Sequence, residues 1–499
     1  MLPAAAAAPP QPPGPPPIPD TSSSRLPKGA ALLHRTSLPR LLKACAKRGA
    51  LSHGRQLHAL SYKLRLSSDL YVQTALLSMY SSCEQPDGAL RVFDRMPHRN
   101  VVAWTAAIDA CLRSDRPDAG VALFRRMLES GGVQPNRFAL VSLLSACSHL
   151  GALGLGRAAH GYVEKAADVE LTAVVGTSLV DMYCKCGALD DASQVFDVMP
   201  NGAKTVQCWN AMLHGFAVHG HGARGLQMFS SMDSMSGGVR PNELTFLALL
   251  CGCSHAGLVE EGRHCFDIMQ KKYGIVPGVK HYSCMVDLLA RAGLLDDALQ
   301  VASTMPVKPN HVIWGSLLSA CKTHKKLGLA EQVMERAVRE GCPIGDTSHY
   351  VIMSNMYREA ELMEKMVGMR MKVGRKPKGK SWIEVGPSVH EFQVRGNSAP
   401  SHPMWGDIRQ MLHEMEEKAG KGRVVDLLDP HSEKIALAFG LLRVSGSAPV
   451  RISKNLRICE ECHSMMKSVS RYYQREIIVR DCTRFHRFAD GRCSCHDYW

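Results

Sequence analysis

Two groups of histidine and cysteine residues near the C-terminus of the sequence could hold metal ions. In the first group, His431 stands two positions before Glu433, and Cys459 and Cys462 form a C-x-x-C pair farther along the chain. An imidazole and two thiolates supply three ligands to zinc and leave its fourth position for water. Zinc lowers the pKa of that water, which gives hydroxide near neutral pH. A glutamate close to the histidine can then move protons.

The first group follows the pattern of zinc-dependent deaminases, H-x-E and then C-x-x-C. In these enzymes hydroxide attacks C4 of cytosine, and the glutamate is not a ligand. A C-x-x-C pair alone would be weak evidence, but the upstream H-x-E makes it much stronger. The proline that usually precedes the first cysteine is replaced by Ile458. We therefore predict a catalytic zinc at His431, Cys459 and Cys462, with Glu433 as the catalytic residue.

The second group is interleaved with the first and consists of His463, His486, Cys493 and Cys495. Four nitrogen and sulfur ligands without a spare position are typical of a closed, structural zinc site. Such a site would help a small domain to fold. The sequence thus predicts two zinc ions per chain. The alternative is that both sites are structural. The mixture of histidine and cysteine disfavours disulfides.

The part of the chain that precedes these two groups contains a long internal repeat. Trp104, Trp209 and Trp314 recur at equal intervals, and Met-Pro and Gly-Arg pairs keep nearly the same period. Within each period, apolar residues fall at i, i+3, i+4 and i+7, as in residues 192–199, which indicates helices with one buried face. Turns that contain glycine, such as Gly187, separate paired helices. A single hairpin of two short helices cannot bury its apolar faces alone, so the hairpins must stack into a solenoid.

Most cysteines of the array are interpreted as small apolar residues of its core. Cys184 and Cys186 could be taken for a ligand pair, but they lie inside a helical pattern. The same pattern predicts that Met363, Met366 and Met369 lie in the core.

The hairpins resemble pentatricopeptide repeats of the plant type in which long and short motifs alternate. The phrases SLVDMYCKCGALDDASQVFDVMP and MVDLLARAGLLDDALQVASTMP are similar to its short motifs, and SLLSACSHLGALGLGRAAHGYV is similar to a long one. The resemblance places about eight repeats at 35–310, two E motifs at 311–380 and an E-plus segment at 381–420. A tetratricopeptide array is disfavoured because unit length varies here, whereas that repeat keeps a period near 34.

The resemblance also implies that the array binds single-stranded RNA, with one base read per repeat. In the family, the fifth and last residues of each motif do this. The corresponding pairs are Thr74 with Asn100, Thr105 with Asn136, Thr177 with Thr205, Asn210 with Asn242, and Ser283 with Asn310. Thr or Ser with Asn favours adenine in the family, and Asn with Asn favours a pyrimidine. The pair of two threonines departs from the usual pattern. Asparagine before a helix is also a common N-cap, and both roles can hold at once.

The C-terminal phrases HSEKIALAFGL, NLRICEECHS and RFHRFADGRCSCHDYW closely resemble the DYW deaminase domain of plant organellar editing factors. The resemblance implies a mostly α protein, in which a right-handed α-solenoid precedes a small α/β zinc-binding cytidine deaminase-like domain at 421–499. It implies the metal and catalytic roles given above, and C-to-U editing of organellar transcripts by a zinc-dependent cytidine deaminase acting on RNA. The start of the domain is shorter than in the family. The alternative is therefore a non-catalytic RNA-binding factor that recruits a deaminase in trans, or that stabilises or processes a transcript.

The overall composition agrees with a nucleic-acid partner. The 499 residues carry 60 Lys and Arg against 46 Asp and Glu, a formal charge of +14, which favours an acidic partner. No apolar run is long enough for a transmembrane helix, so membrane insertion is not expected. Residues 1–34 are rich in Pro, Ala and Ser, which is typical of a transit peptide or a disordered leader. We predict the mitochondrion, with the chloroplast as the alternative. Accessory editing factors are potential partners.

Overall fold

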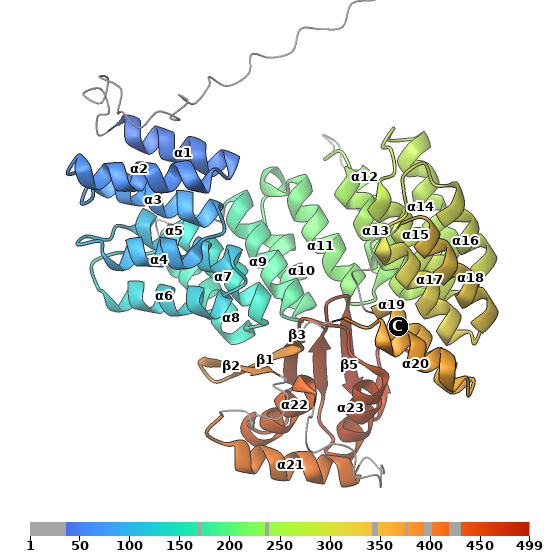
Figure 1. Ribbon diagram of the computed structural model, residues 1–499. Coiled ribbons are helices and arrows are strands. Elements are labelled where there is room, and N and C mark those ends of the chain that lie inside the picture. Colours follow the sequence, from blue (N-terminus) through green and yellow to red (C-terminus); the bar gives the residue numbers. More distant parts are fainter. Residues whose placement is uncertain are drawn as a thin grey trace, which may run out of the picture. The chain divides into compact units, whose positions relative to one another are not determined.

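The computed structural model describes residues 36–166, 171–234, 239–341, 348–374, 378–393, 402–418 and 431–498. The chain divides into two compact units, residues 1–99 and 100–499. The described part is mostly helical, with one small sheet near the C-terminal end (Figure 1). The predicted leader and residues 421–430 at the start of the deaminase-like domain lie outside the described residues. A search of the described segments finds no helix that could span a membrane.

Paired helices make up most of the described residues of each unit. In the first unit the pairs are α1 (Ser37–Arg48) with α2 (Leu51–Lys63), and α3 (Leu70–Ser82) with α4 (Pro86–Asp94). In the second unit they are α5 (Val101–Arg113) with α6 (Pro117–Glu129), α7 (Arg137–Leu150) with α8 (Leu153–Lys165), α9 (Ala173–Lys185) with α10 (Leu189–Val198), α11 (Val206–Val218) with α12 (Gly222–Ser234), α13 (Glu243–Ala256) with α14 (Val259–Lys271), α15 (Val279–Arg291) with α16 (Leu295–Thr304), α17 (His311–Thr323) with α18 (Leu327–Arg339), and α19 (Ser348–Glu359) with α20 (Met363–Met371).

Local sequence explains where many of these helices begin and end. The side chain of Asn136 accepts hydrogen bonds from the backbone amides of Phe138 and Ala139, which caps α7. Such a cap contributes about 1 kcal/mol. In the pair of α9 and α10, Gly187 adopts φ +77° after α9. This left-handed conformation suits glycine, and it ends the helix so that the chain can reverse into α10.

The apolar faces predicted from helical spacing lie in the core, which confirms the helical interpretation. Val195, Phe196 and Met199 are all buried, and so are Cys184 and Cys186. The prediction for the methionines of α20 was wrong. Met363 is 57% exposed, and Met366 and Met369 are only partly buried against the core cluster that contains α17 and α19. The reason is that α20 packs on α19, and the side of α20 that carries Met363 is not covered. Helical spacing identifies an apolar face but does not show whether a neighbouring element buries it.

The C-terminal part of the second unit is a sheet covered by helices. Its strand order is β2-β1-β3-β4-β5-β6, and all pairs are antiparallel except β3 with β4. The strands are β1 (Lys380–Val385), β2 (Ser388–Gln393), β3 (Val450–Lys454), β4 (Ile477–Arg480), β5 (Phe485–Ala489) and β6 (Arg492–Cys493), and the helices are α21 (Trp405–Lys418), α22 (Ser432–Arg443) and α23 (Glu460–Tyr472). One apolar cluster joins all of these helices to the sheet. β1 and β2, from the predicted E-plus segment, therefore share a core with the deaminase-like residues.

Within the second unit, charged side chains of the sheet bind the ends of repeat helices. Glu384 on β1 accepts hydrogen bonds from the backbone amides of Gly154 (2.7 Å) and Leu155 (3.0 Å) in the first turn of α8. Arg480 on β4 donates to the carbonyl oxygens of His149 (2.6 Å) at the end of α7 and Lys185 (2.7 Å) at the end of α9. An anion at a helix N-terminus and a cation at a C-terminus both match the helix dipole.

Replacing Glu384 with alanine is expected to speed hydrogen exchange at the Leu155 amide by roughly tenfold or more, because a hydrogen bond to a charged group contributes about 1.5–3 kcal/mol. Amide hydrogen exchange followed by mass spectrometry measures this in the purified chain. Glu417→Ala is the matched control, since that carboxylate on α21 is 63% exposed. Unchanged protection of Leu155 in Glu384→Ala would contradict this contact.

Candidate functional site

The first predicted metal group is assembled at the N-termini of two helices. His431 is the N-cap residue of α22, Cys459 is the N-cap residue of α23, and Cys462 lies in the first turn of α23. The His431 Nδ1 atom is 3.2 Å from the Cys462 sulfur and 3.4 Å from the Cys459 sulfur. With the Glu433 carboxylate, these ligand atoms all lie within 4.8 Å of one another. The structure thus brings together all four residues predicted for this site.

The two cysteines of this group share a proton. Their mutual hydrogen bond lowers the pKa of Cys459 to about 4 and raises the pKa of Cys462 well above its usual value. The positive end of the α23 dipole also favours a thiolate here. A divalent cation would displace the shared proton and bind both sulfurs. One imidazole nitrogen and two thiolates are a donor set that fits zinc.

Glu433 is held as a buried carboxylate. Its side chain is 1% exposed and forms an ion pair through Oε1 with the ammonium group of Lys454 on β3. Burial raises the pKa of Glu433, but the charge and hydrogen bond of Lys454, a backbone hydrogen bond and the charge of His431 together outweigh burial, so the pKa lies below its usual range. Oε1 is also 4.0 Å from His431 Nδ1. Lys454 was not predicted from the sequence. The available signal was that this lysine ends a short segment of alternating β-branched and polar residues, VRISK, just before the C-x-x-C pair.

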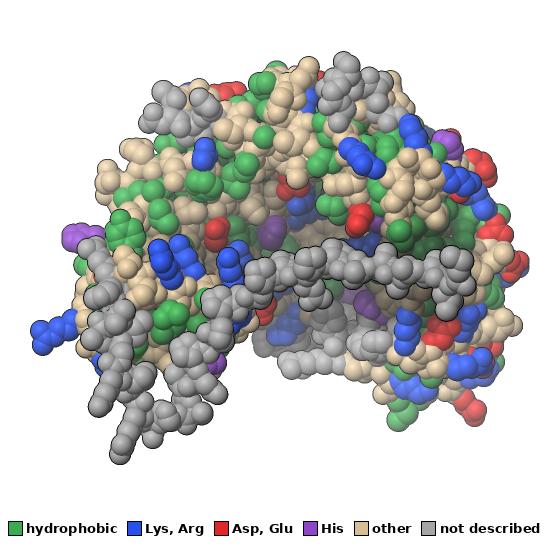
Figure 2. Space-filling model, turned by 90° about the horizontal axis from the view of Figure 1, so that it is seen from above, with side chains coloured by type: hydrophobic (Ala, Val, Ile, Leu, Met, Phe, Trp, Pro, Cys, Tyr) green, Lys and Arg blue, Asp and Glu red, His purple; other side chains and the backbone are tan. Residues whose placement is uncertain are grey.

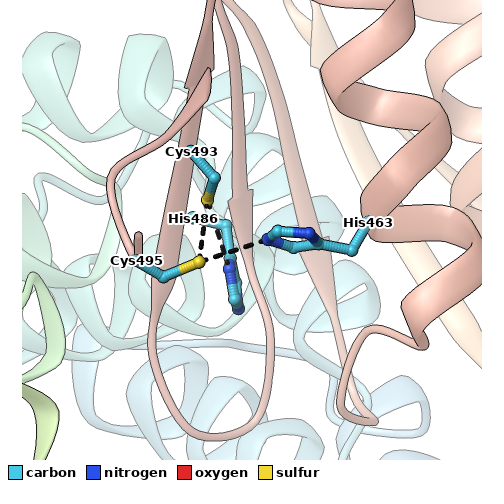
Figure 3. Close-up of side chains that lie close together, drawn as sticks. All are labelled: His463, His486, Cys493 and Cys495. Atoms are coloured by element: carbon cyan, nitrogen blue, oxygen red, sulfur yellow. Dashed lines mark hydrogen bonds between the residues drawn. The ribbon is translucent and has the colours of Figure 1, made fainter. Parts of the chain in front are cut away.

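The second predicted metal group also comes together, as Figure 3 shows. His463 projects from α23, His486 from β5, and Cys493 from β6, with Cys495 just after it. The sulfur of Cys495 is 3.2 Å from His463 Nε2 and 3.2 Å from the Cys493 sulfur, and the Cys493 sulfur is 3.6 Å from His486 Nδ1. All four side chains are buried. Four soft or borderline donors without access to water suit a closed zinc site.

Two aspartates lie beside the histidines of the second group. Asp481 is buried, and its Oδ2 atom lies 3.5 Å from His486 Nε2 and accepts a hydrogen bond from the Ile458 amide (3.2 Å). Asp497 Oδ1 lies 3.8 Å from His463 Nδ1. Carboxylates behind ligating histidines fix the ring orientation and the tautomer. Asp481 also contacts the backbone next to Cys459, so it connects the two groups. Sequence reasoning missed both roles.

The predicted RNA-reading residues occupy the starts of the first helices of the pairs. Asn100, Asn136, Asn242 and Asn310 are all N-cap residues whose side-chain oxygens accept backbone hydrogen bonds. Thr205 is an N-cap residue without a side-chain cap. The predicted fifth residues lie near the starts of the first helices of their own pairs: Thr74 in α3, Thr105 in α5, Thr177 in α9, Asn210 in α11 and Ser283 in α15.

One predicted reading pair is joined directly. The side-chain amide of Asn210 donates to the Asn242 side-chain oxygen at 3.0 Å, and Asn210 Oδ1 accepts from the Thr245 hydroxyl at 2.7 Å. The capping role considered for the last residues of the motifs is confirmed for Asn100, Asn136, Asn242 and Asn310. Because capping uses the oxygen, the NH₂ group of each capping asparagine is the part suited to contact a base.

Comparison with known proteins identifies both parts of the chain. Residues 405–499 match the DYW family of nucleic acid deaminases. Matches to the PPR repeat lie at 74–101, 102–132, 169–200, 207–236, 244–273, 280–308 and 312–342. The last of these repeat matches lies in the segment predicted as the first E motif.

Relatives in Arabidopsis thaliana extend over nearly the whole chain. A pentatricopeptide repeat-containing protein described as chloroplastic is 42% identical over 93% of this chain and 78% of its own length. Another, described as chloroplastic/mitochondrial, is 38% identical over 95% of this chain and 78% of its own length. A third, chloroplastic, is 38% identical, and this chain spans 63% of its length.

A solved structure supports the repeat fold. The pentatricopeptide repeat protein PPR10, crystallised with an 18-nucleotide psaJ RNA element, matches 67% of this chain and 49% of its own chain with a TM-score of 0.57 at 18% identity. At this identity the likeness shows the fold alone. The repeats, the C-terminal match and the relatives together show that this chain belongs to the pentatricopeptide repeat proteins that carry a DYW deaminase domain.

Proposed function

We propose that this chain binds single-stranded organellar RNA along its repeats and converts a cytidine in it to uridine by zinc-dependent hydrolysis. The carrying observation is the first metal group, in which His431, Cys459 and Cys462 converge beside the buried carboxylate of Glu433. A glutamate two residues after the ligating histidine is the arrangement that zinc deaminases use to move protons. The second group, with four buried donors, would hold a structural zinc, which gives two zinc ions per chain.

The chemistry divides between the metal and the glutamate. Zinc held by His431, Cys459 and Cys462 would activate water for attack on C4 of cytosine. Glu433 would accept one proton of that water and pass it to N3 of the ring, and would then move the second proton from the oxygen added at C4 to the departing amino group, so that cytidine and water give uridine and ammonia. Lys454 binds Oε1, the oxygen that also lies 4.0 Å from His431 Nδ1, and so holds the carboxylate in its charged form beside the metal group. Burial keeps this carboxylate away from bulk water, which would otherwise compete for the proton.

RNA binding rests on the repeats and on charge. Each capping asparagine uses its oxygen at a helix start, and its NH₂ group can donate to a base edge. On the face seen in Figure 2, Lys and Arg side chains are spread over the surface with Asp and Glu among them, so attraction to phosphates is distributed. The relatives described as chloroplastic or mitochondrial support an organellar location, and we propose the mitochondrion.

Sequencing of organellar RNA from a line that lacks the protein tests this function. One or a few C-to-U events are expected to disappear, and the full chain is expected to restore them. Persistence of every editing event in that line would contradict the proposal. Loss of a transcript without loss of editing would instead favour a factor that protects or processes RNA.

The pair of Asn210 and Asn242 offers a test of base reading. By the family pattern, Asn210→Thr changes a pyrimidine-preferring pair to an adenine-preferring one, while a threonine hydroxyl can still accept from Thr245. The ratio of affinities for RNAs with adenine or a pyrimidine at that position is expected to change by roughly tenfold, which corresponds to one hydrogen bond of about 1 kcal/mol or more. Fluorescence anisotropy with matched RNAs measures this ratio. Gln207→Thr, at an exposed position of α11, is the control, and an unchanged ratio in Asn210→Thr would contradict the assignment.

A further inference from the structure

The first metal group contains one potential ligand too many for an open site. The carboxylate of Glu433 belongs to the same cluster of atoms within 4.8 Å as the three other donors. Carboxylate oxygens are among the ligands that zinc takes in proteins. If Glu433 bound the metal, the site would have four protein ligands and no position for water. The proposed hydrolysis therefore requires that something hold Glu433 away from the metal.

Lys454 is the residue that does so geometrically. Its ammonium group contacts Glu433 Oε1, and the two side chains are 7% and 1% exposed. β3 pairs with β1 on one side and β4 on the other, which fixes the backbone of Lys454 opposite Ser381. Within a poorly solvated interior, attraction between opposite charges is stronger than at the surface. Lys434, a second buried lysine on α22, is engaged by Glu461 at 2.6 Å.

The other oxygen of Glu433 is held more weakly. The hydroxyl group of Ser432 donates to Oε2 at 3.4 Å, and Ser432 is itself 3.0 Å from the Ser381 hydroxyl on β1. A charged partner therefore holds one oxygen and a neutral hydroxyl touches the other. This asymmetry fixes the carboxylate against β3, with Oε1, the oxygen nearer to His431, held by the charged partner.

We propose that Lys454 is a positioning residue that holds Glu433 off the metal and so keeps a coordination position open for water. The inference rests on the proposed function, because it needs a metal at His431, Cys459 and Cys462. It predicts that loss of Lys454 converts an open site with three protein ligands into a closed site with four. Such a site binds zinc more tightly and does not react.

Zinc affinity of the purified full chain tests this without RNA. The affinity is measured by letting a chromogenic chelator compete with the protein for zinc. The zinc that the wild type binds and the His431→Ala variant does not is assigned to the first group. Lys454→Met is expected to bind that zinc at least roughly tenfold more tightly than the wild type, the scale of effect seen when groups around a metal site change. Lys454→Arg keeps the charge, so its affinity is expected to stay within about threefold of the wild type.

Two further variants separate ligation from simple charge removal. Glu433→Gln keeps a hydrogen bond to Lys454, and its zinc affinity is expected to equal that of the wild type within about threefold, because Glu433 is not a ligand there. In Lys454→Met with Glu433→Gln, the tightening is expected to vanish, since the amide is a poor ligand; the double-mutant cycle isolates this term. Tightening that persists in the double variant would show a charge effect and overturn the inference.

The Glu433→Gln variant decides the question even if Lys454→Met does not fold. A tenfold or greater loss of zinc affinity in Glu433→Gln would show that Glu433 already binds the metal, and Lys454 would then not hold it away. If the His431→Ala variant holds as much zinc as the wild type, the metal assignment itself is overturned. That result would refute the proposed function, whereas the two preceding results refute only the role of Lys454.

Discussion

Replacing Glu433 with glutamine is expected to lower the rate of cytidine conversion by roughly a thousandfold, the usual effect of removing a general acid–base group. An amide can neither accept the proton of the attacking water nor return it to the amino group. RNA affinity and zinc content are expected to remain unchanged, because the reading residues lie on the repeats and Glu433 is held by Lys454. Single-turnover conversion and RNA binding are measured on the same preparation.

Glutamine is a sharper substitution than alanine at this position. Alanine would leave the buried ammonium group of Lys454 without its partner, and an unpaired buried charge destabilises a protein by several kcal/mol. The matched control is Glu417→Gln on α21, where the carboxylate is 63% exposed. Conversion by Glu433→Gln at the wild-type rate, with no other deaminase present, would refute the proton-transfer role of Glu433.

Replacing Cys495 with serine is expected to unfold the deaminase-like domain while the repeats remain helical. Cys493 and Cys495 belong to the apolar cluster that joins α23 to the sheet, so a metal held there would connect the elements of that core. Structural zinc contributes about 10–16 kcal/mol in small zinc domains, which is comparable to the total stability of a domain. Loss of one of four ligands therefore removes much of the folding free energy.

Thermal melting and zinc content measure this second effect. The unfolding transition of the C-terminal part is expected to disappear from the melting curve, and one zinc ion per chain is expected to be lost. Cys482→Ser is the matched control because Cys482 is an exposed cysteine of the same domain, and it should melt as the wild type does. A Cys495→Ser variant that retains two zinc ions and an unchanged melting curve would contradict a structural role for this group.

The two metal groups could be predicted from sequence because zinc selects residue types whose spacing is short and restricted. The asparagine caps were equally readable, since a cap depends on a few neighbouring residues. Lys454 and Asp481 could not be predicted in the same way. Lys454 meets Glu433 only because β3 lies beside the start of α22, and Asp481 reaches Ile458 and His486 through the pairing of β4 with β5. These contacts depend on how the strands and helices pack together, which spacing along the chain does not reveal.

The helical pattern had a similar limit. Spacing of apolar residues showed correctly that Phe196 and Met199 face the core, because further helix pairs pack on them. The same spacing in α20 gave the wrong result for Met363, which is 57% exposed. Periodicity reports the face that a helix could bury, whereas burial also requires a neighbour that covers it.

Conversion of cytidine to uridine in a matched RNA by the purified, zinc-loaded chain alone tests the central claim most directly. The RNA carries the sequence around an editing site that is lost in the line without the protein, and uridine is detected by sequencing after incubation. The proposed function predicts conversion at that cytidine, its loss when a chelator removes zinc, and its loss in Glu433→Gln. An RNA that is bound with high affinity but never converted by the zinc-loaded chain would contradict the claim.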